Sequence, residues 1–245
     1  RITVTLEPSE QTVQIAEEIA KRAEAIYGGS VDPHIDNMLK VTSDGKKLAL
    51  DPRCYVPTSE DEEGSKLNAC AQNIFEIWED TQGFKGTQIV FCDLSTPKVR
   101  FEDYTYGTDF DAYNDLKYKL VQMGIPKDQI AFIHEAGTDE QKQMLFDKVN
   151  AGEVRVLIGS TEKCGAGTNV QKRLVALHHL DTPYRPSDME QREGRIIRQG
   201  NTNEKVQIYT YVMERTLDSY SYQILENKQL FISQNNRADL TIRES

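Results

Sequence analysis

The protein has 245 residues, of which 29 are Lys or Arg and 39 are Asp or Glu, so its formal net charge is −10. This balance excludes a global positive potential that would draw the chain to nucleic acid or to an anionic membrane, so any contact with phosphate must be local. No apolar run approaches the ~20 residues needed to cross a bilayer, and we expect a cytoplasmic protein without membrane contact. Because the chain begins with Arg1 rather than Met, we expect it to be a segment of a larger protein.

The four cysteines do not indicate a metal or redox site. They are far apart in the sequence, and no two have the C-x-x-C spacing of zinc sites or redox motifs. We expect Cys54, Cys70, Cys92 and Cys164 to be reduced thiols with structural roles.

Residues 1–85 are predicted to form a helical segment that leads into the main domain. Apolar residues at helical spacing predict amphipathic helices over 10–27 and 66–81. The acidic run "PTSEDEEGS" between these helices is interpreted as an exposed loop. A metal-binding acidic box is the alternative for this run.

Residues 86–245 are predicted to form an α/β domain. Short apolar runs predict strands, and helical stretches lie between most of them. The strands are expected at 88–92, 130–134, 154–158, 174–180 and 206–212, and the helices at 111–123, 140–151 and 187–198. This alternation predicts a doubly wound parallel sheet with helices on both faces. The stretch near 98–129 is interpreted as a surface insertion, and a last helix at 216–231 is expected to pack back on the domain.

Two groups of ring side chains leave alternatives open. Tyr104, Tyr106 and Tyr113 lie in the predicted insertion, where they could stack on nucleic-acid bases or pack within an ordinary loop. His178 and His179 lie in a predicted strand and are interpreted as buried or edge residues rather than as ligands.

Two loops follow predicted strands, where ligands bind in open parallel sheets. The first, "GSTEKCGAGTNV" at 159–170, has glycines that would let backbone N–H groups approach a phosphate. A turn without a ligand accounts for the same residues.

The second loop leads into "SDMEQREGRIIRQG" at 187–200. Ser187 and Glu190 have the spacing of a capping box, which predicts a helix that begins here. The helix would carry Arg192, Arg195 and Arg198 on one broad face and Gly194 in its interior. A bound anion such as phosphate would offset this clustering of charge. Surface ion pairs with the abundant acidic residues are the alternative.

These stretches resemble the motifs of one family. "QREGRIIRQG" resembles the sixth motif of superfamily two helicases and DNA translocases, Q-x-x-G-R-x-x-R-x-G, while "GSTEKCGAGTNV" is similar to the fifth motif and "TQIVFCD" to the fourth. The resemblance is to Swi/Snf-type members, and among them to the large helicase–methylase polypeptides of phages and mobile elements. It is strongest over 86–231 and implies a RecA-like parallel sheet with flanking helices. Swi/Snf proteins usually carry an aspartate where this chain has Glu193-Gly194, so nucleosome remodelling is not implied.

The resemblance implies roles for individual residues. Arg195 and Arg198 match the arginine fingers, which stabilise charge on a transferring phosphoryl group, and Gln191 matches the glutamine that faces the γ-phosphate and the attacking water. Nucleotide binding or coupling is implied for Gly165, Gly167, Asn169, Gly194 and Arg192. Contacts with the DNA backbone are implied for Ser160, Thr161 and Thr138. No metal ligand is implied.

The chain lacks the motifs that would hold the nucleotide. No G-x-x-x-x-G-K-[ST] occurs, and no predicted strand ends in a D-E-x-x box. In the family these elements belong to the first lobe, which binds ATP with Mg²⁺. We therefore expect the second motor lobe of an ATP-dependent DNA helicase or translocase, with DNA and the first RecA-like lobe of the same polypeptide as partners, and no activity of the isolated chain. The alternative is a non-catalytic module that kept the fold for binding DNA or a partner.

Overall fold

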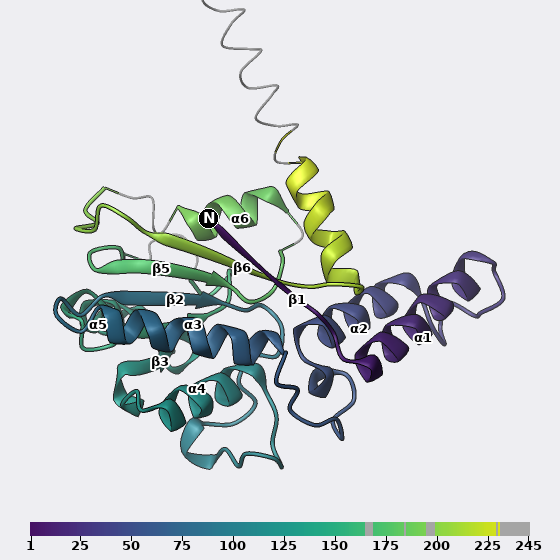
Figure 1. Ribbon diagram of the computed structural model, residues 1–245, viewed down its shortest axis with the longest axis horizontal. Helices are drawn as coiled ribbons and strands as arrows, with labels where there is room; N and C mark the ends of the chain where they lie inside the picture. Colours follow the sequence, from purple (N-terminus) through teal and green to yellow (C-terminus); the bar gives the residue numbers. More distant parts are fainter. Residues whose placement is uncertain (165–168, 184, 195–198, 229, 231–245) are drawn as a thin grey trace, which may run out of the picture.

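The computed structural model describes residues 1–164, 169–183, 185–194, 199–228 and 230. Within these ranges six strands form one sheet in the order β1-β6-β5-β2-β4-β3, and all neighbouring strands are parallel (Figure 1). Their bounds are β1 (Ile2–Leu6), β2 (Thr87–Phe91), β3 (Ile130–Phe132), β4 (Val156–Gly159), β5 (Leu174–His179) and β6 (Gln207–Met213). The predicted parallel α/β fold is confirmed.

Helices connect most of the strands. They are α1 (Glu10–Tyr27), α2 (Met38–Leu50), α3 (Lys66–Asp80), α4 (Ala112–Met123), α5 (Asp139–Ala151) and α6 (Pro186–Glu193), with short 3-10 helices at Pro52–Cys54, Phe101–Asp103, Lys127–Gln129 and Ile133–Glu135. A further helical stretch covers 217–228. Several helices begin at a residue whose side chain accepts a hydrogen bond from the first turn, which satisfies a free backbone N–H; these are Ser9, Asn37, Ser65, Asp111 and Thr138.

None of the helices in the described ranges is both long enough and apolar enough to span a membrane.

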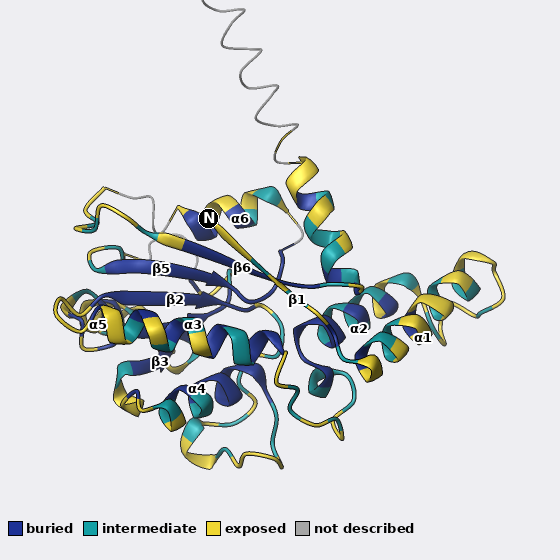
Figure 2. Ribbon diagram, in the orientation of Figure 1, coloured by how far each residue is buried: buried dark blue, intermediate teal, exposed yellow. Residues whose placement is uncertain are grey.

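The sheet is covered on both faces, as its alternating side chains require. Val90 packs in a core cluster with residues of α3 and α4, whereas Ile89 and Phe91, which point to the other face, pack in a cluster with residues of α5. All five residues of β2 are buried, and Figure 2 shows the central strands buried while the outer sides of the helices are exposed. Complete burial of such a side chain contributes about 1.5–3 kcal/mol.

The N-terminal segment contains two elements that the sequence reading did not predict. β1 pairs in parallel with β6 at the edge of the sheet, with Ile2 opposite Tyr209. α2 packs against α1 around a small core of Ile19, Val41 and Leu48. Figure 1 shows this helix pair extending beyond the sheet. The N-terminal segment therefore contributes a strand to the main sheet as well as helices.

The stretch interpreted as a surface insertion is partly core. α4 lies within it, and Tyr113 and Leu116 are fully buried. The Tyr113 hydroxyl donates to the Cys92 carbonyl, and Tyr106 stacks on Tyr118 with ring centroids 4.5 Å apart. Tyr113 is therefore part of the core, whereas Tyr106 is 42% exposed, and most residues ahead of α4 lie outside the core.

α6 differs from its prediction at both ends. It begins at Pro186 with Arg185 as its N-cap, no side chain caps it, and it ends at Glu193 with Gly194 as its C-cap. The prediction of a capping box formed by Ser187 and Glu190 is therefore wrong. Proline favours the first helical position because its fixed φ suits the helix and its missing N–H would have no partner there.

Candidate functional site

Polar residues follow three neighbouring strands at the carboxyl-terminal end of the sheet. Asp93 lies two residues beyond β2, Asp181 two residues beyond β5, and Ser160 and Thr161 directly after β4. Because β5, β2 and β4 are adjacent and parallel, their carboxyl ends bring these side chains to one place, which is where open α/β sheets bind ligands.

Arg192 of α6 joins these three strand ends. Its Nη2 lies 2.7 Å from Oδ2 of Asp93 and 3.0 Å from Oδ1 of Asp181, and its Nε donates to Oγ1 of Thr161 at 2.7 Å. Nη1 donates to the Asp181 carbonyl at 2.9 Å. The residue is fully buried, and its guanidinium carbon lies 5.3 Å from the centroid of the Phe91 ring. A side chain predicted to lie on a helix face is thus the centre of a buried network.

The network favours the charged forms of Arg192 and Asp93. Burial alone would lower the pKa of the Arg192 guanidinium, but the charges of Asp181 and Asp93 outweigh it and raise that pKa. Burial likewise pushes the pKa of the Asp93 carboxyl upward, yet the charge of Arg192 and hydrogen bonds from Thr161 hold it below its ordinary value. A buried guanidinium is stable in this setting because its fork of donors is matched by carboxylate and carbonyl oxygens.

The loop after β4 is fixed to the same network. The backbone N–H of Thr161 donates to Oδ1 of Asp93 at 2.6 Å, and its hydroxyl donates to Oδ2 at 2.8 Å. Ser160 is 8% exposed, and its Oγ accepts from the Lys163 N–H at 3.2 Å. Gly159 is needed for the close turn, because a Cβ at this position would lie 2.4 Å from Sγ of Cys164. The position of the loop is therefore set by Asp93 and through it by Arg192.

A hollow of about 460 Å³ opens above this network. It is lined by residues from the ends of β2, β3 and β4 and from α6: Asp93, Thr96, His134, Ser160, Thr161, Glu162, Lys163, Asp188 and Gln191. The structure thus brings together Ser160 and Thr161, predicted to contact the DNA backbone, and Gln191, predicted to face the nucleotide. We call this space the strand-end hollow.

Other predicted residues lie elsewhere. Thr138 is exposed and caps α5, with its Oγ1 accepting from the Gln141 N–H at 3.2 Å. Asn169 is exposed, and its carbonyl accepts from the Asn150 amide at 2.7 Å. The N–H of Gly194 donates to the Glu190 carbonyl at 2.8 Å as α6 ends. Gly165, Gly167, Arg195 and Arg198 lie outside the described residues.

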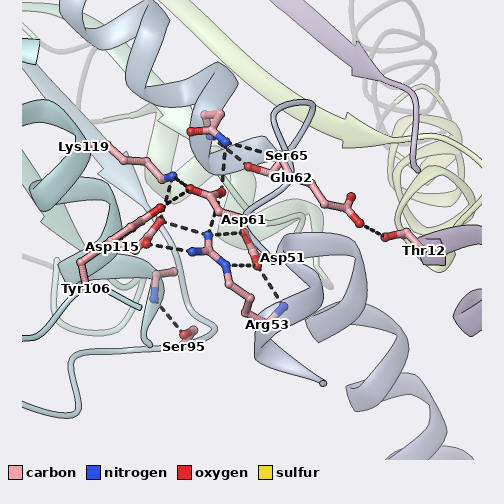
Figure 3. Close-up of polar contacts among 12 residues, drawn as sticks. Thr12, Asp51, Arg53, Asp61, Glu62, Ser65, Ser95, Tyr106, Asp115 and Lys119 are labelled. Atoms are coloured by element: carbon pink, nitrogen blue, oxygen red, sulfur yellow. Dashed lines mark hydrogen bonds and ion pairs between the residues drawn. The ribbon is translucent and has the colours of Figure 1, made fainter. Parts of the chain in front are cut away.

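One residue of the acidic run, Asp61, belongs to an ion-pair network (Figure 3). Arg53 contacts Asp51 at 2.9 Å, Asp115 at 3.0 Å and Asp61 at 3.1 Å, and Lys119 also pairs with Asp61. Asp51 and Asp115 have fully buried side chains. Across the described ranges no group of three or more His, Cys, Asp or Glu side chains could hold a metal ion. The network joins the N-terminal segment to α4.

The paired histidines and the cysteines have structural roles. His178 bonds the Tyr211 hydroxyl and the Gln88 amide oxygen, each at 2.9 Å, and burial lowers its pKa to about 3. His179 is also fully buried, and burial lowers its pKa to about 4. Cys54, Cys70, Cys92 and Cys164 are all free thiols. Cys70, Cys92 and Cys164 are buried, and Cys54 is half-buried.

A parallel sheet with helices on both faces and a polar network at its strand ends defines a RecA-like lobe. Residues 81–200 match the family model described as the helicase conserved C-terminal domain. This part of the chain is therefore similar to the helicase C-terminal domain family. A crystal structure of the C-terminal part of the Fun30 ATPase domain has the same fold, with a TM-score of 0.50, 18% identity, and coverage of 74% of this chain and 52% of that one.

Two further similarities are more limited. Defense against restriction protein B of Escherichia phage P1 is 29% identical over 89 residues, which is 36% of this chain and 4% of the phage protein. A structure of S. cerevisiae Dbp5 bound to Gle1 and IP6 has a TM-score of 0.43 and 19% identity, and the match covers 67% of this chain and 37% of that one. The chain thus spans a small fraction of the phage protein and about half of the Fun30 structure.

Sequence reasoning missed several residues of the site. It did not identify Asp93, Lys163 or His134, and it used Asp181 only as the end of a strand. The available signal was position, because Asp93 and Asp181 each follow a buried strand at the same distance, and neighbouring strands carry them to one edge.

Proposed function

We propose that this chain is the second motor lobe of an ATP-dependent DNA helicase or translocase. The observation that carries the proposal is the strand-end hollow, which unites Ser160, Thr161 and Gln191 around the buried Arg192. The helicase C-terminal domain match over residues 81–200 supports the same class. The phage source of one relative supports the narrower proposal of a Swi/Snf-type helicase–methylase polypeptide of a phage or mobile element.

The proposed division of work follows from the elements that carry each residue. Gln191 lies on α6, next to Arg192, and would orient the water that attacks the nucleotide. Ser160 and Thr161 lie on the loop after β4 and would contact the DNA backbone. ATP with Mg²⁺, held mainly by a first lobe, supplies the phosphoryl group whose hydrolysis drives the cycle. Arg195 and Arg198 are proposed to stabilise its developing charge.

The experiment is ATP hydrolysis, with and without DNA, by the chain alone and by the chain joined to a first RecA-like lobe. We expect turnover only in the joined form, with stimulation by DNA. Arg195→Ala should reduce kcat by about 10³-fold or more, the magnitude known for arginine fingers, and Gln191→Ala should also reduce kcat.

Lys21→Ala is the matched control, because Lys21 is an exposed cation on α1, away from the strand ends. Near-normal turnover of folded Arg195→Ala would refute the finger assignment. Absence of turnover in every form, from folded protein, would favour a non-catalytic binding module.

A further inference from the structure

A second hollow, of about 1080 Å³, lies along the outer side of β3. β3 is the last strand in the sheet order, so no strand of the described residues pairs with this side. The walls include Lys117, Ile130, Phe132 and Leu145. His134 lines both this hollow and the strand-end hollow, so the two spaces border the same side chain just after β3. We call the second space the β3 hollow.

Lys117 is an unpaired cation within this wall. The residue is 6% exposed, and its Nζ lies 4.8 Å from the centroid of the Phe101 ring and 5.1 Å from that of Phe132. Among the described residues it has neither a hydrogen bond nor an ion pair. Burial lowers the pKa of its ammonium. The charges of Glu135 and Glu102 offset part of this effect without forming an ion pair, and an anion in direct contact would offset the remaining penalty of burial.

The nearest carboxylates are directed to other partners. Glu135 accepts from the Phe132 N–H at 3.3 Å, and Glu102 lies 3.7 Å from Arg100. Asp128 and Glu153 also line the hollow, together with four further cations: Lys98, Arg100, Lys127 and Lys148. With Lys117 included, the hollow is lined by five cations and four carboxylates, so its balance is slightly positive, although the chain as a whole carries a net charge of −10.

His134 provides a second unsatisfied group at the junction of the two hollows. Its Nδ1 is buried and has no hydrogen-bond partner among the described residues. A buried polar atom without a partner is unfavourable, and a ligand or water that passes from one hollow to the other would satisfy it. The space is also much larger than one inorganic phosphate needs, which favours an extended ligand.

We propose that Lys117 binds a backbone phosphate of a nucleic-acid strand, so that the DNA track runs from the loop after β4, past His134, along the outer side of β3. This inference rests on the proposed function, because it extends the strand that contacts Ser160 and Thr161. It adds a contact that lies outside the motifs identified in the sequence.

The test measures binding of a labelled single-stranded DNA to the protein as a function of salt. Each phosphate contact contributes about 0.7 to the slope of log affinity against log salt for single strands. Lys117→Met keeps the length of the apolar stem and removes the charge, so it should lower the slope by about 0.7. When the salt is raised from 50 to 200 mM, the factor by which DNA affinity falls should then be about 2.6 times smaller for Lys117→Met than for the unmodified protein.

Lys21→Met is the matched control, since it removes the same charge from an exposed position on α1, and Lys117→Arg should retain the slope. Urea unfolding confirms that each variant is folded. In parallel, the NMR signal of the Lys117 ammonium, assigned by its loss in Lys117→Met, is followed during titration with DNA and with inorganic phosphate. We expect DNA to shift it at far lower phosphate concentration.

Three results would overturn the inference. If Lys117→Met has the same slope as Lys21→Met, the track does not include Lys117, while the proposed function stands. If inorganic phosphate shifts the ammonium signal as strongly as DNA does, the site binds small anions rather than a strand. If the unmodified protein binds no DNA, both the track and the DNA contacts of the proposed function fail, and the turnover measurement then decides the catalytic part separately.

Discussion

Replacing Arg192 by Met should destabilise the fold far more than removing a surface arginine. The change leaves Asp181, whose side chain is 8% exposed, without its counter-charge, and breaking a buried ion pair by removing one partner costs about 3–5 kcal/mol. The side chain of Asp93 is 40% exposed, so solvent screens its share. We therefore expect a loss near the lower end, about 3 kcal/mol.

The assay is urea unfolding at pH 7 and at pH 3, with Arg100→Met as control. Arg100 and Glu102 lie 3.7 Å apart with side chains 81% and 55% exposed, and such pairs contribute at most about 1 kcal/mol. The pKa of Asp93 is held low in the folded protein. The contribution of Asp93 to stability is therefore complete above its pKa in the unfolded chain, about 3.9, and is lost as the pH falls through its pKa in the folded protein. The effect of Arg192→Met should therefore shrink at pH 3. A loss at pH 7 no larger than that of Arg100→Met would refute the reasoning.

Two further predictions concern the sheet. Burial lowers the pKa of His178 to about 3, so below pH ~6.5 the unfolded chain binds more protons than the folded protein, and the fold should lose stability as the pH falls from about 6.5 toward 4. His178→Gln should make this dependence of the unfolding free energy on pH shallower in urea unfolding. An unchanged dependence would contradict the prediction. Gly159→Ala should destabilise the fold by about 1–3 kcal/mol through overpacking, since the added Cβ would lie 2.4 Å from Sγ of Cys164. Gly83→Ala is the control, because no atom lies within 4 Å of its added Cβ, and it should be nearly neutral in thermal unfolding. Equal effects of the two variants would exclude overpacking as the cause.

The five strands of the main domain were predictable because each is a continuous apolar run. Strands buried on both faces carry this pattern in the sequence itself, and the structure places each within a few residues of its expected position. The helices at α3, α4 and α5 were predictable for a similar reason, since each presents one apolar face to the sheet.

β1 and α2 were not predicted because their stability comes from distant partners. None of the five residues in "ITVTL" is fully buried. All five pair with residues of β6 far along the chain, for example Val4 with Tyr211. α2 contains Gly45, which local propensity disfavours in a helix. The structure explains this glycine, because a Cβ there would lie 3.0 Å from the Leu217 side chain.

The site was predictable in its residue types and less so in its geometry. The motif spacing indicated that Gln191, Arg192, Ser160 and Thr161 belong together, and the structure places all four around one hollow or its floor. Helical periodicity could not show that Arg192 points inward, because its partners are carboxylates at the ends of two other strands. Lys117 was not identified for the same reason, since its setting depends on the rings of Phe101, in a short 3-10 helix, and Phe132, in β3.

The pairing of β1 with β6 also bears on how the chain folds during synthesis. β1 leaves the ribosome before the other strands of the sheet, yet its partner strand, with Tyr209 opposite Ile2, is made only after most of the domain. Pairings between segments so distant in sequence form slowly, because the intervening chain must close a long loop. The first strand must therefore wait unpaired while the central strands assemble, and the sheet acquires its outer edge as one of the last steps of folding.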